Sequence, residues 1–307
     1  MGDQGTSSKT GAGWVKYGGN PVLGGELGTC FDVCLVREKG RFLMWFSWRP
    51  KQSVVLVESR DGIHWGEPLI VLSPNPDSGW EDDINRPVVV RRPDGFRMWY
   101  TGQAKGGSRI GLARSPDGKT WTRVSDRAVM IPDQPWEKVA VMCPHVLWDP
   151  KRRLYRMWYS AGDQHEPDAI GYATSPDGLT WSKHPENPIF APDRSAAWES
   201  HKVTACQVIR EGEWHLMFYI GFRDEHHARI GLARSRDGIS GWERHPANPI
   251  IVPGVADDAW DRDAVYKPYA LFHAGRWMLW YNGRREGVEQ IGLALYEGRD
   301  LRWGGSD

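Results

Sequence analysis

The sequence predicts an all-β protein, a five-bladed β-propeller with four antiparallel strands in each blade. Three observations lead to this fold class. The pattern Ile-Gly-x-Ala-x-Ser-x-Asp-Gly recurs along the chain, and recurrence at a nearly constant spacing is typical of one structural unit stacked many times. The strand-like runs are short, rich in aromatic and β-branched residues, and bounded by Gly, Pro and Asp. No stretch of the 307 residues shows a sustained helical period.

The recurring pattern describes the third strand of each unit and the turn that follows it. Clear copies begin at Ile110, Ile170 and Ile230, a worn copy begins at Val54, and a degenerate copy begins at Ile291. Asp-Gly favours a tight turn after the strand, because Gly tolerates the positive φ that such turns need. The turn aspartates are therefore expected to hold the turn and not to act in catalysis. They are Asp61, Asp117, Asp177 and Asp237.

The remaining strands of a unit are predicted from runs on either side of this pattern. An acidic corner, in which Trp precedes Glu or Asp, opens each full unit, and its acids are expected to be scaffold. They are Glu81, Glu137, Glu199 and Asp261. A short apolar strand follows as the innermost strand, and an aromatic strand such as residues 97–100 or 156–159 comes next. The Asn-Pro segments at residues 187–190 and 248–251 are expected to supply the fourth strand.

The fifth unit ends at Trp303 without a fourth strand, and the N-terminus is predicted to provide it. Residues 14–23 match residues 181–190 and 242–251 in the spacing from Trp to Asn-Pro. Pairing of residues 14–23 with residues 291–295 would close the ring and leave no free sheet edge there. We therefore expect a single domain over residues 14–307, preceded by a disordered leader over the polar residues 1–13.

Composition excludes several classes of protein. The chain carries 39 basic and 39 acidic residues, so no basic surface for nucleic acid is indicated. No apolar run is long enough to span a membrane. The four cysteines fall in or beside predicted inner strands and are interpreted as buried thiols, which favours a cytoplasmic protein. They are Cys30, Cys34, Cys143 and Cys206. Most of the 18 tryptophans are assigned to packing between blades, with sugar stacking at Trp45 or Trp48 as the alternative.

The candidate functional site is predicted at the central axis, which the innermost strands line. Aligning these strands on the Pro that follows Arg86, Cys143 and Lys267 places Asp32 and Ala205 at the equivalent position in the other two blades. Charges in a narrow channel cost desolvation unless they pair or bind something. We therefore expect Asp32 to be the functional carboxylate, with Arg86 and Lys267 stabilising its ionised form.

Other residues near the predicted channel complete the set of candidates. Asp83 and Asp263 are further candidate catalytic acids, because neither belongs to the pattern shared by all blades. The candidate substrate-binding residues, besides Arg86 and Lys267, are His145, His201, Tyr266 and Arg284. No cofactor and no metal ligand are expected, and a calcium ion in the channel is the alternative left open. The expected partner is a small-molecule or oligosaccharide substrate.

The Met-Trp-Tyr strands and the Ser-x-Asp-Gly-x-x-Trp turns resemble those of a known group of propellers. They are similar to the five-bladed propellers of glycoside hydrolase families 43, 32 and 62 and of the related mannoside phosphorylases of family 130. The family 43 resemblance implies a general-base Asp on blade 1, a position that Asp32 matches. It implies a second Asp on blade 2, where Arg86 stands, and a general-acid Glu on blade 3. That third position falls near residues 142–144, where no carboxylate occurs.

Three functions follow from these candidates, in this order of preference. The first is glycosidase-like hydrolysis with Asp32 as general base and with Asp83 or Asp263 in place of the absent Glu. The second is phosphorolysis, or action on an anionic sugar, with Arg86, Lys267, His201 and Arg284 cradling the oxyanion. The third is a non-catalytic or repurposed propeller that binds a sugar without turnover.

Overall fold

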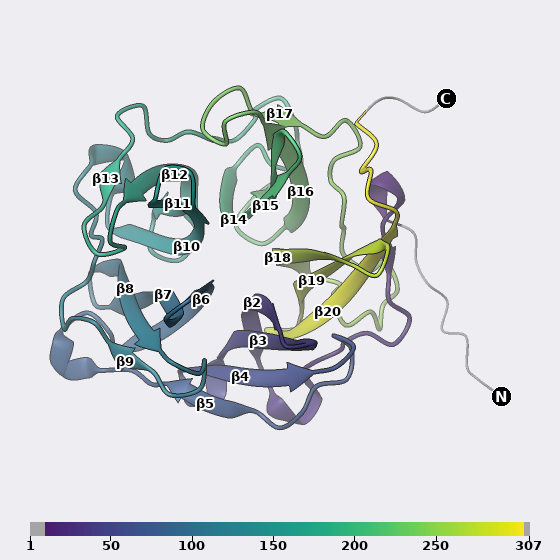
Figure 1. The fold of residues 1–307 in the computed structure, drawn as a ribbon. Coiled ribbons are helices and arrows are strands. Elements are labelled where there is room, and N and C mark those ends of the chain that lie inside the picture. The colour runs from purple at the N-terminus through teal and green to yellow at the C-terminus, as the bar shows by residue number, and fades with distance from the viewer. Residues whose placement is uncertain (1–9, 304–307) are drawn as a thin grey trace.

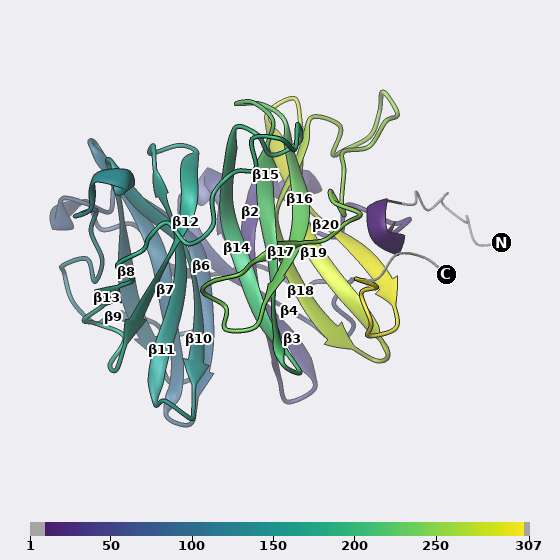
Figure 2. The same cartoon turned by 90° about the horizontal axis from the view of Figure 1, so that it is seen from above.

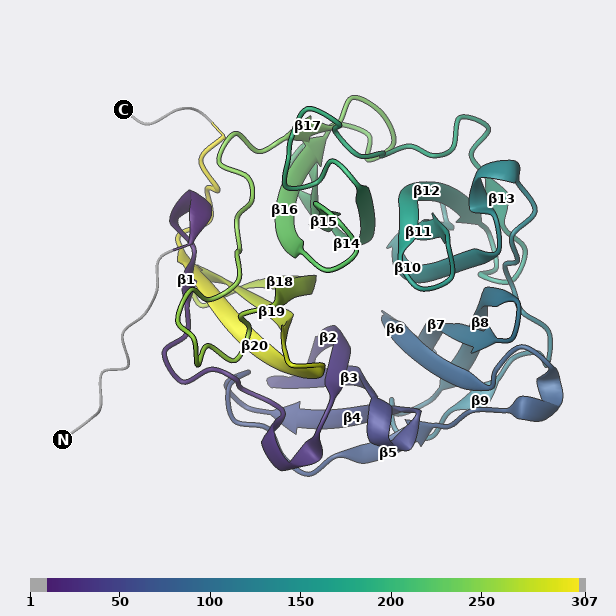
Figure 3. The same cartoon turned by 180° about the vertical axis from the view of Figure 1, so that it is seen from behind.

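The computed structural model describes residues 10–303, and in that range it is an all-β propeller. Four-stranded antiparallel units surround a central axis, and their first strands lie nearest the centre (Figures 1 and 3). This confirms the predicted fold class, and the strand pairing in the described range is consistent with five blades. Within the described residues, no helix is long and apolar enough to cross a membrane.

The strands follow one another from the axis outward in each blade. Blade 1 holds β2 (Cys30–Glu38), β3 (Arg41–Trp48), β4 (Ser53–Ser59) and β5 (Leu69–Leu72). Blade 2 holds β6 (Asp83–Arg92), β7 (Gly95–Ala104), β8 (Gly107–Ser115) and β9 (Thr122–Arg123). Blade 3 holds β10 (Ala140–Asp149), β11 (Leu154–Gly162), β12 (Pro167–Ser175) and β13 (Ser182–Lys183). Blade 4 holds β14 (Lys202–Glu211), β15 (Trp214–Phe222), β16 (Ala228–Ser235) and β17 (Glu243–Arg244). Blade 5 holds β18 (Ala264–His273), β19 (Arg276–Arg285), β20 (Val288–Glu297) and β1 (Val15–Lys16).

The N-terminal strand closes the last blade, as predicted. β1 pairs antiparallel with β20, with Val15 opposite Leu295, and Leu23 forms a further bridge to Ile291. The purple start of the described chain therefore lies beside the yellow β20 (Figures 1 and 2). One consequence is that the sheet of blade 5 is assembled from the two ends of the sequence.

The described residues begin at residue 10, before the predicted start of the domain at residue 14. Of the leader expected over residues 1–13, residues 1–9 lie outside the described residues. The short 3-10 helix η1 (Gly11–Gly13) precedes Trp14, whose side chain is fully buried against Phe218 and Tyr296. Residues 11–13 thus belong to the fold and not to a leader.

The acids of the Trp-acid corners are buried scaffold. Glu81 accepts a hydrogen bond from the Tyr100 hydroxyl (3.0 Å) and another from Nε of Arg123 in the outer strand (2.7 Å). A similar arrangement, in which a buried acid contacts a Tyr of the second strand, a cation of the outer strand, or both, recurs in the other blades. It joins Glu137 to Tyr159 and Lys183, Glu199 to Arg244, and Asp261 to Tyr281 and Lys16. Lys16 lies on β1. The strand that closes the ring is therefore held by an ion pair equivalent to those that hold the outer strands of the other blades.

The fourth strand begins earlier than predicted and is interrupted. In blade 3 the paired residues are those of β13, directly after the turn, and not residues 187–190. The side-chain amide of Asn187 then takes over the pairing, accepting from the Tyr172 N–H (2.8 Å) and donating to its carbonyl (3.1 Å). The following Pro has no N–H to continue a ladder, and the chain rejoins the sheet at Ile189 and Phe190, whose N–H groups donate to the carbonyl of Ile170. Blade 4 repeats this arrangement with Asn248.

The tryptophans of the second strands pack between blades. Trp45 is fully buried, and its indole N–H donates to the carbonyl of Gly118 in the turn of the next blade (3.2 Å). This position excludes the alternative that Trp45 stacks on a sugar at the channel mouth. The same bond joins Trp99 to Gly178, Trp158 to Gly238 and Trp280 to Gly62. Trp48 instead donates to the carbonyl of Leu27 (2.7 Å).

Candidate functional site

Each inner strand bends at the position that the internal sequence alignment singled out. The pairing of β2 with β3 skips a step between Phe31 and Cys34, and the other inner strands skip at the equivalent place. The first residue of each bulge has a left-handed backbone. These residues are Asp32 (φ 60°), Arg86 (φ 55°), Cys143 (φ 52°), Ala205 (φ 40°) and Lys267 (φ 52°). Bulges re-aim side chains, and here all of these residues face one cavity at the axis.

Small polar side chains of the preceding blade hold these bulges in place. Ser47 accepts a hydrogen bond from the backbone N–H of Arg86 (3.0 Å), and Asn282 accepts one from the N–H of Asp32 (3.2 Å). Thr101 and Ser160 do the same for Cys143 and Ala205. A left-handed backbone at a non-glycine residue costs on the order of 1–3 kcal/mol. The surrounding structure therefore holds a costly backbone conformation at these residues. The result is that five side chains turn toward the axis.

The cavity has a volume of about 270 Å³ and lies at the end of the channel where the inner strands begin. Its lining is strongly charged. The carboxyl groups are Asp32, Glu166 and Glu289, and the cations are Arg49, Arg86, Lys267 and Arg284. So dense a mixture of charges in a concave site is a usual mark of a binding or catalytic site.

Asp32 is the most deeply placed carboxylate of the cavity. It is 3% exposed, and Nζ of Lys267 lies 3.5 Å from its Oδ1. The Ser47 hydroxyl donates to its Oδ2 at 3.3 Å. The expected cation therefore stands beside it, and the same Ser47 oxygen also accepts from the N–H of Arg86, so one side chain couples the two positions.

Glu166 is the cavity residue that the sequence reasoning missed. It directly precedes β12, in the loop that follows β11, and it is partly buried. Burial raises the pKa of Glu166 to about 7, even though Arg86, Lys202 and Arg284 act to lower it. Among the described residues, no cation lies within ion-pair distance of its carboxylate. The sequence did contain a signal. In blade 3 no carboxylate occurs at residues 142–144 of the inner strand, but Glu166 directly precedes the third strand.

Arg86 lines the cavity, and its guanidinium group is only partly hydrogen-bonded within the described residues. Its Nη1 donates to Oδ1 of Asn85 at 2.6 Å, whereas its buried Nε has no hydrogen-bond partner among the described residues. Burial alone would lower the pKa of Arg86, but the negative groups around it, Asp32 and Glu166 among them, raise that pKa overall. Arg86 is thus a permanent cation at the axis.

Glu289 is the remaining carboxyl group of the cavity lining. Glu289 at the start of β20 pairs with Arg49 (3.3 Å) and accepts a hydrogen bond from the hydroxyl of Tyr266. Arg284 donates to the carbonyl of His226 at 2.9 Å. Glu289 is consequently occupied by protein groups, and Tyr266 is held with its ring against the cavity.

The structure brings five of the nine candidate residues together. Asp32, Arg86, Tyr266, Lys267 and Arg284 line the cavity. The two alternative acids do not. Asp83 lies at the start of β6 beside the Asn85 amide (3.5 Å), where burial raises its pKa. Asp263 accepts from the backbone N–H of Glu286 at 2.7 Å.

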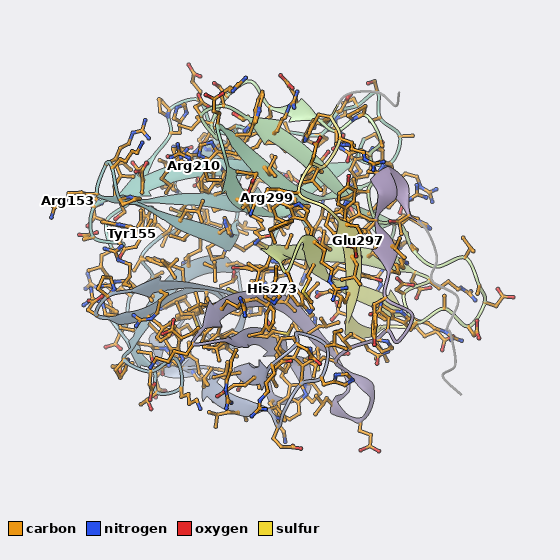
Figure 4. All side chains as sticks on the ribbon, turned by 45° about the vertical axis from the view of Figure 1, so that its right-hand side comes forward. Arg153, Tyr155, Arg210, His273, Glu297 and Arg299 are labelled. Carbon is orange, nitrogen blue, oxygen red and sulfur yellow. The ribbon has the colours of Figure 1, made fainter. Side chains whose placement is uncertain are left out.

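The two candidate histidines also lie away from the cavity. His145 bonds through Nε2 to the carbonyl of Val208 (2.8 Å), and burial lowers its pKa to about 4. It faces a separate hollow of about 420 Å³ at the opposite end of the channel, which Arg210 and Arg299 also line (labelled in Figure 4). His201 pairs with Glu225 at 2.8 Å. The strand bulge explains His145, because it turns Cys143 and His145 toward different ends of the channel.

The channel lining bears on the calcium ion that the sequence analysis left open. The narrow passage below the cavity, of about 30 Å³, is lined by Arg86 and Lys267 together with Asp32. Within residues 10–303, no group of three or more His, Cys, Asp or Glu side chains could hold a metal. Calcium takes about six to eight oxygen ligands, and two cations at the axis oppose it.

Comparison with known proteins places the chain among carbohydrate-active propellers. The sequence pattern of the glycosyl hydrolases family 32 N-terminal domain matches residues 34–219. A protein of Mycobacterium tuberculosis (strain CDC 1551 / Oshkosh), described only as uncharacterised, is 29% identical over 220 residues, which cover 68% of this chain and 70% of that protein. This relative carries no assigned activity to compare.

Solved structures share the fold. A protein described as a glycoside hydrolase superposes with a TM-score of 0.74 at 20% identity, over 90% of each chain. A thermostable family-43 glycoside hydrolase superposes with a TM-score of 0.70 at 16% identity, over 98% of each chain. A β-1,2-mannobiose phosphorylase from Listeria innocua, in complex with β-1,2-mannobiose, gives a TM-score of 0.70 at 14% identity, over 92% of this chain and 96% of that one.

Proposed function

The chain belongs to the family of the glycosyl hydrolases family 32 N-terminal domain, and from this premise we propose that it hydrolyses a glycosidic bond in the channel cavity. Asp32 acts as general base and Glu166 as general acid. Glu166 thereby takes the role for which the sequence suggested Asp83 or Asp263, neither of which lines the cavity.

One observation carries this proposal: two carboxyl groups face the same cavity in opposite electrostatic surroundings. Asp32 has the Lys267 ammonium and the Ser47 hydroxyl donor beside it. Glu166 has no ion-pair partner among the described residues, and burial raises its pKa to about 7, so it holds a proton near neutral pH. Glycoside hydrolysis needs one carboxyl group in each state, and pairs of acids whose surroundings separate their pKa values supply them.

The chemical step follows from these two states. The Asp32 carboxylate takes a proton from a water molecule as that water attacks the anomeric carbon. The Glu166 carboxyl group gives its proton to the departing glycosidic oxygen. Attack by water on the face opposite the leaving group inverts the anomeric centre. We therefore expect proton NMR of the fresh product to show the inverted anomer, and a retained anomer would instead assign Asp32 as a nucleophile.

The pH dependence of turnover tests the role of Glu166. Glu166 must be protonated to act as an acid, so kcat/KM is expected to fall as pH rises through about 7. Burial raises the pKa of Glu166, and the cations Arg86, Lys202, Arg284 and Lys267 lower it. Glu166→Gln should remove this alkaline limb and lower kcat/KM by about 10²- to 10⁴-fold for alkyl glycosides. The loss should be much smaller for dinitrophenyl glycosides, whose leaving group departs without protonation.

A neighbouring acid provides the matched control. Asp163 lies in the same loop and pairs with Lys138 (3.2 Å) and Lys202 (3.3 Å), outside the cavity lining. Asp163→Asn should keep the alkaline limb. An unchanged limb in Glu166→Gln would assign proton donation to another group. Sugar binding by calorimetry without turnover of any glycoside would favour a non-catalytic binder.

A further inference from the structure

The cavity contains two guanidinium groups that form no ion pair with a carboxylate of the described residues. Of its four cations, Arg49 pairs with Glu289 and Lys267 pairs with Asp32. The other two are Arg86 and Arg284, and among residues 10–303 neither has a carboxylate oxygen within 4.0 Å. The third carboxyl group of the cavity, Glu166, is the one that burial keeps protonated near neutral pH in the proposed reaction. The reactive state of the cavity therefore carries an excess of positive charge.

The position of Arg86 argues that this excess serves a ligand. Its backbone is held in the left-handed region, and the bulge that results turns the side chain into the channel. Its Nη1 is engaged by Asn85, while the buried Nε makes no hydrogen bond within the described part of the chain. Buried donors in proteins nearly always have a partner, so an incompletely bonded guanidinium group in a cavity lining is a candidate for binding a ligand. A guanidinium group can give a carboxylate two parallel hydrogen bonds.

We propose that the sugar bound in this cavity is acidic, a uronic acid whose carboxylate is clamped by Arg86 with Arg284 on the opposite side. This inference rests on the proposed hydrolysis and names its substrate class. A planar guanidinium matches a carboxylate in shape and charge, and a second one completes the neutralisation. A neutral hexose would leave both groups desolvated and unpaired, which is costly in a partly closed site. The cavity thus favours uronides over neutral glycosides.

Inorganic phosphate presents the same oxyanion chemistry, as a co-substrate of phosphorolysis. The two sources differ in what they demand of an assay. A uronide carries its anion within the substrate and reacts in phosphate-free buffer, whereas phosphorolysis stops without phosphate. Measuring turnover with and without phosphate therefore separates them.

The first experiment compares matched 4-nitrophenyl glycosides in phosphate-free buffer: the glucuronide against the glucoside, and the galacturonide against the galactoside. We expect kcat/KM to be about 10²-fold higher for a uronide than for its neutral partner, because a neutral substrate leaves the buried cations without a charged partner. Arg86→Met should lower the ratio of uronide to neutral kcat/KM by a similar factor, and the ratio is the readout because Arg86 also acts on the pKa of Glu166. Arg86→Lys should recover part of the loss, since it restores the charge without the paired donors.

The adjacent residue supplies the control. Arg285 follows Arg284 on β19, but its guanidinium donates to the carbonyl of Asp258 (2.9 Å) and does not line the cavity. Arg285→Met should keep the preference for uronides. Equal turnover of neutral and acidic glycosides, or turnover only with phosphate present, would overturn the proposed substrate class.

A binding measurement separates this inference from the proposed function. Calorimetry with the Asp32→Asn variant measures recognition without the chemical step, using D-glucuronate, D-galacturonate, D-glucose and inorganic phosphate as probes. Binding of a uronate that is lost in Asp32→Asn/Arg86→Met supports the acidic sugar even if no glycoside is hydrolysed. Hydrolysis of neutral glycosides with no uronate binding in either assay leaves the proposed hydrolysis standing and rejects the acidic sugar.

Discussion

Asp32→Asn is expected to lower kcat/KM by about 10²- to 10⁴-fold, the range that a positioned general base contributes. The amide has the volume of the carboxylate, and its single oxygen can still accept from either the Ser47 hydroxyl or the Lys267 ammonium, but it cannot take a proton from water. The backbone bond from the Asp32 N–H to Asn282 is untouched. We therefore expect the fold to be retained while turnover is lost, as measured by steady-state kinetics together with thermal unfolding.

The alternative is that Asp32 only locks the blades together through its pair with Lys267. That role predicts the reverse outcome, with a lower melting temperature and unchanged turnover. Asp94→Asn is the matched control, because Asp94 pairs with Arg97 on the exposed hairpin of blade 2. A larger loss of activity in Asp83→Asn or Asp263→Asn than in Asp32→Asn would move the base to that residue.

Lys16→Met is expected to destabilise the whole protein by about 3–5 kcal/mol, because it leaves a buried carboxylate without its cation. Nζ of Lys16 lies 2.5 Å from Oδ2 of Asp261, and the two side chains are 9% and 2% exposed. Burial lowers the pKa of Lys16 even though Asp261 acts to raise it, which is the expected result for a desolvated pair. The loss also falls on the only strand that joins the two ends of the sequence in the described range. Urea unfolding of the full chain measures it.

The other blades provide the control for this prediction. Arg123 and Arg244 hold the equivalent acids in blades 2 and 4, so Lys16→Arg should retain most of the stability. Asp261→Asn combined with Lys16→Met should recover part of the lost free energy, since the unpaired charge is then absent. Unfolding of Lys16→Met at the same urea concentration as the parent would show that the Lys16–Asp261 pair adds no stability to the ring closure.

The internal repeats were sufficient to locate the backbone of the site. Aligning five copies within one sequence identified the equivalent residues of the inner strands, and the structure gives every one of them a bulge with positive φ. This success has a simple reason: strands that pair in a repeated register keep their spacing, so an alignment along them is reliable. The acids of the Trp-acid corners could be assigned to the scaffold for the same reason.

Glu166 could not be identified in that way. It lies in a connecting loop, where the blades differ in length and sequence, so no repeat position marks it. Its chemical character comes from burial among Arg86, Lys202 and Arg284, which three different blades contribute. His145 illustrates the opposite error. It stands two residues after Cys143 on an inner strand, but the bulge sends its side chain to the opposite end of the channel, where the carbonyl of Val208 binds it.

The sequence by itself determined the fold class, the closing strand, and the position of Asp32, Arg86 and Lys267 around the cavity at the axis. These features follow from local patterns that repeat along the chain. Only the tertiary structure decided which carboxyl group has its pKa raised by burial, which cations of the cavity form no ion pair within residues 10–303, and which candidates face elsewhere. The reason is physical: desolvation and charge pairing depend on distances between blades, and side-chain direction at a bulge depends on backbone geometry that residue spacing does not contain.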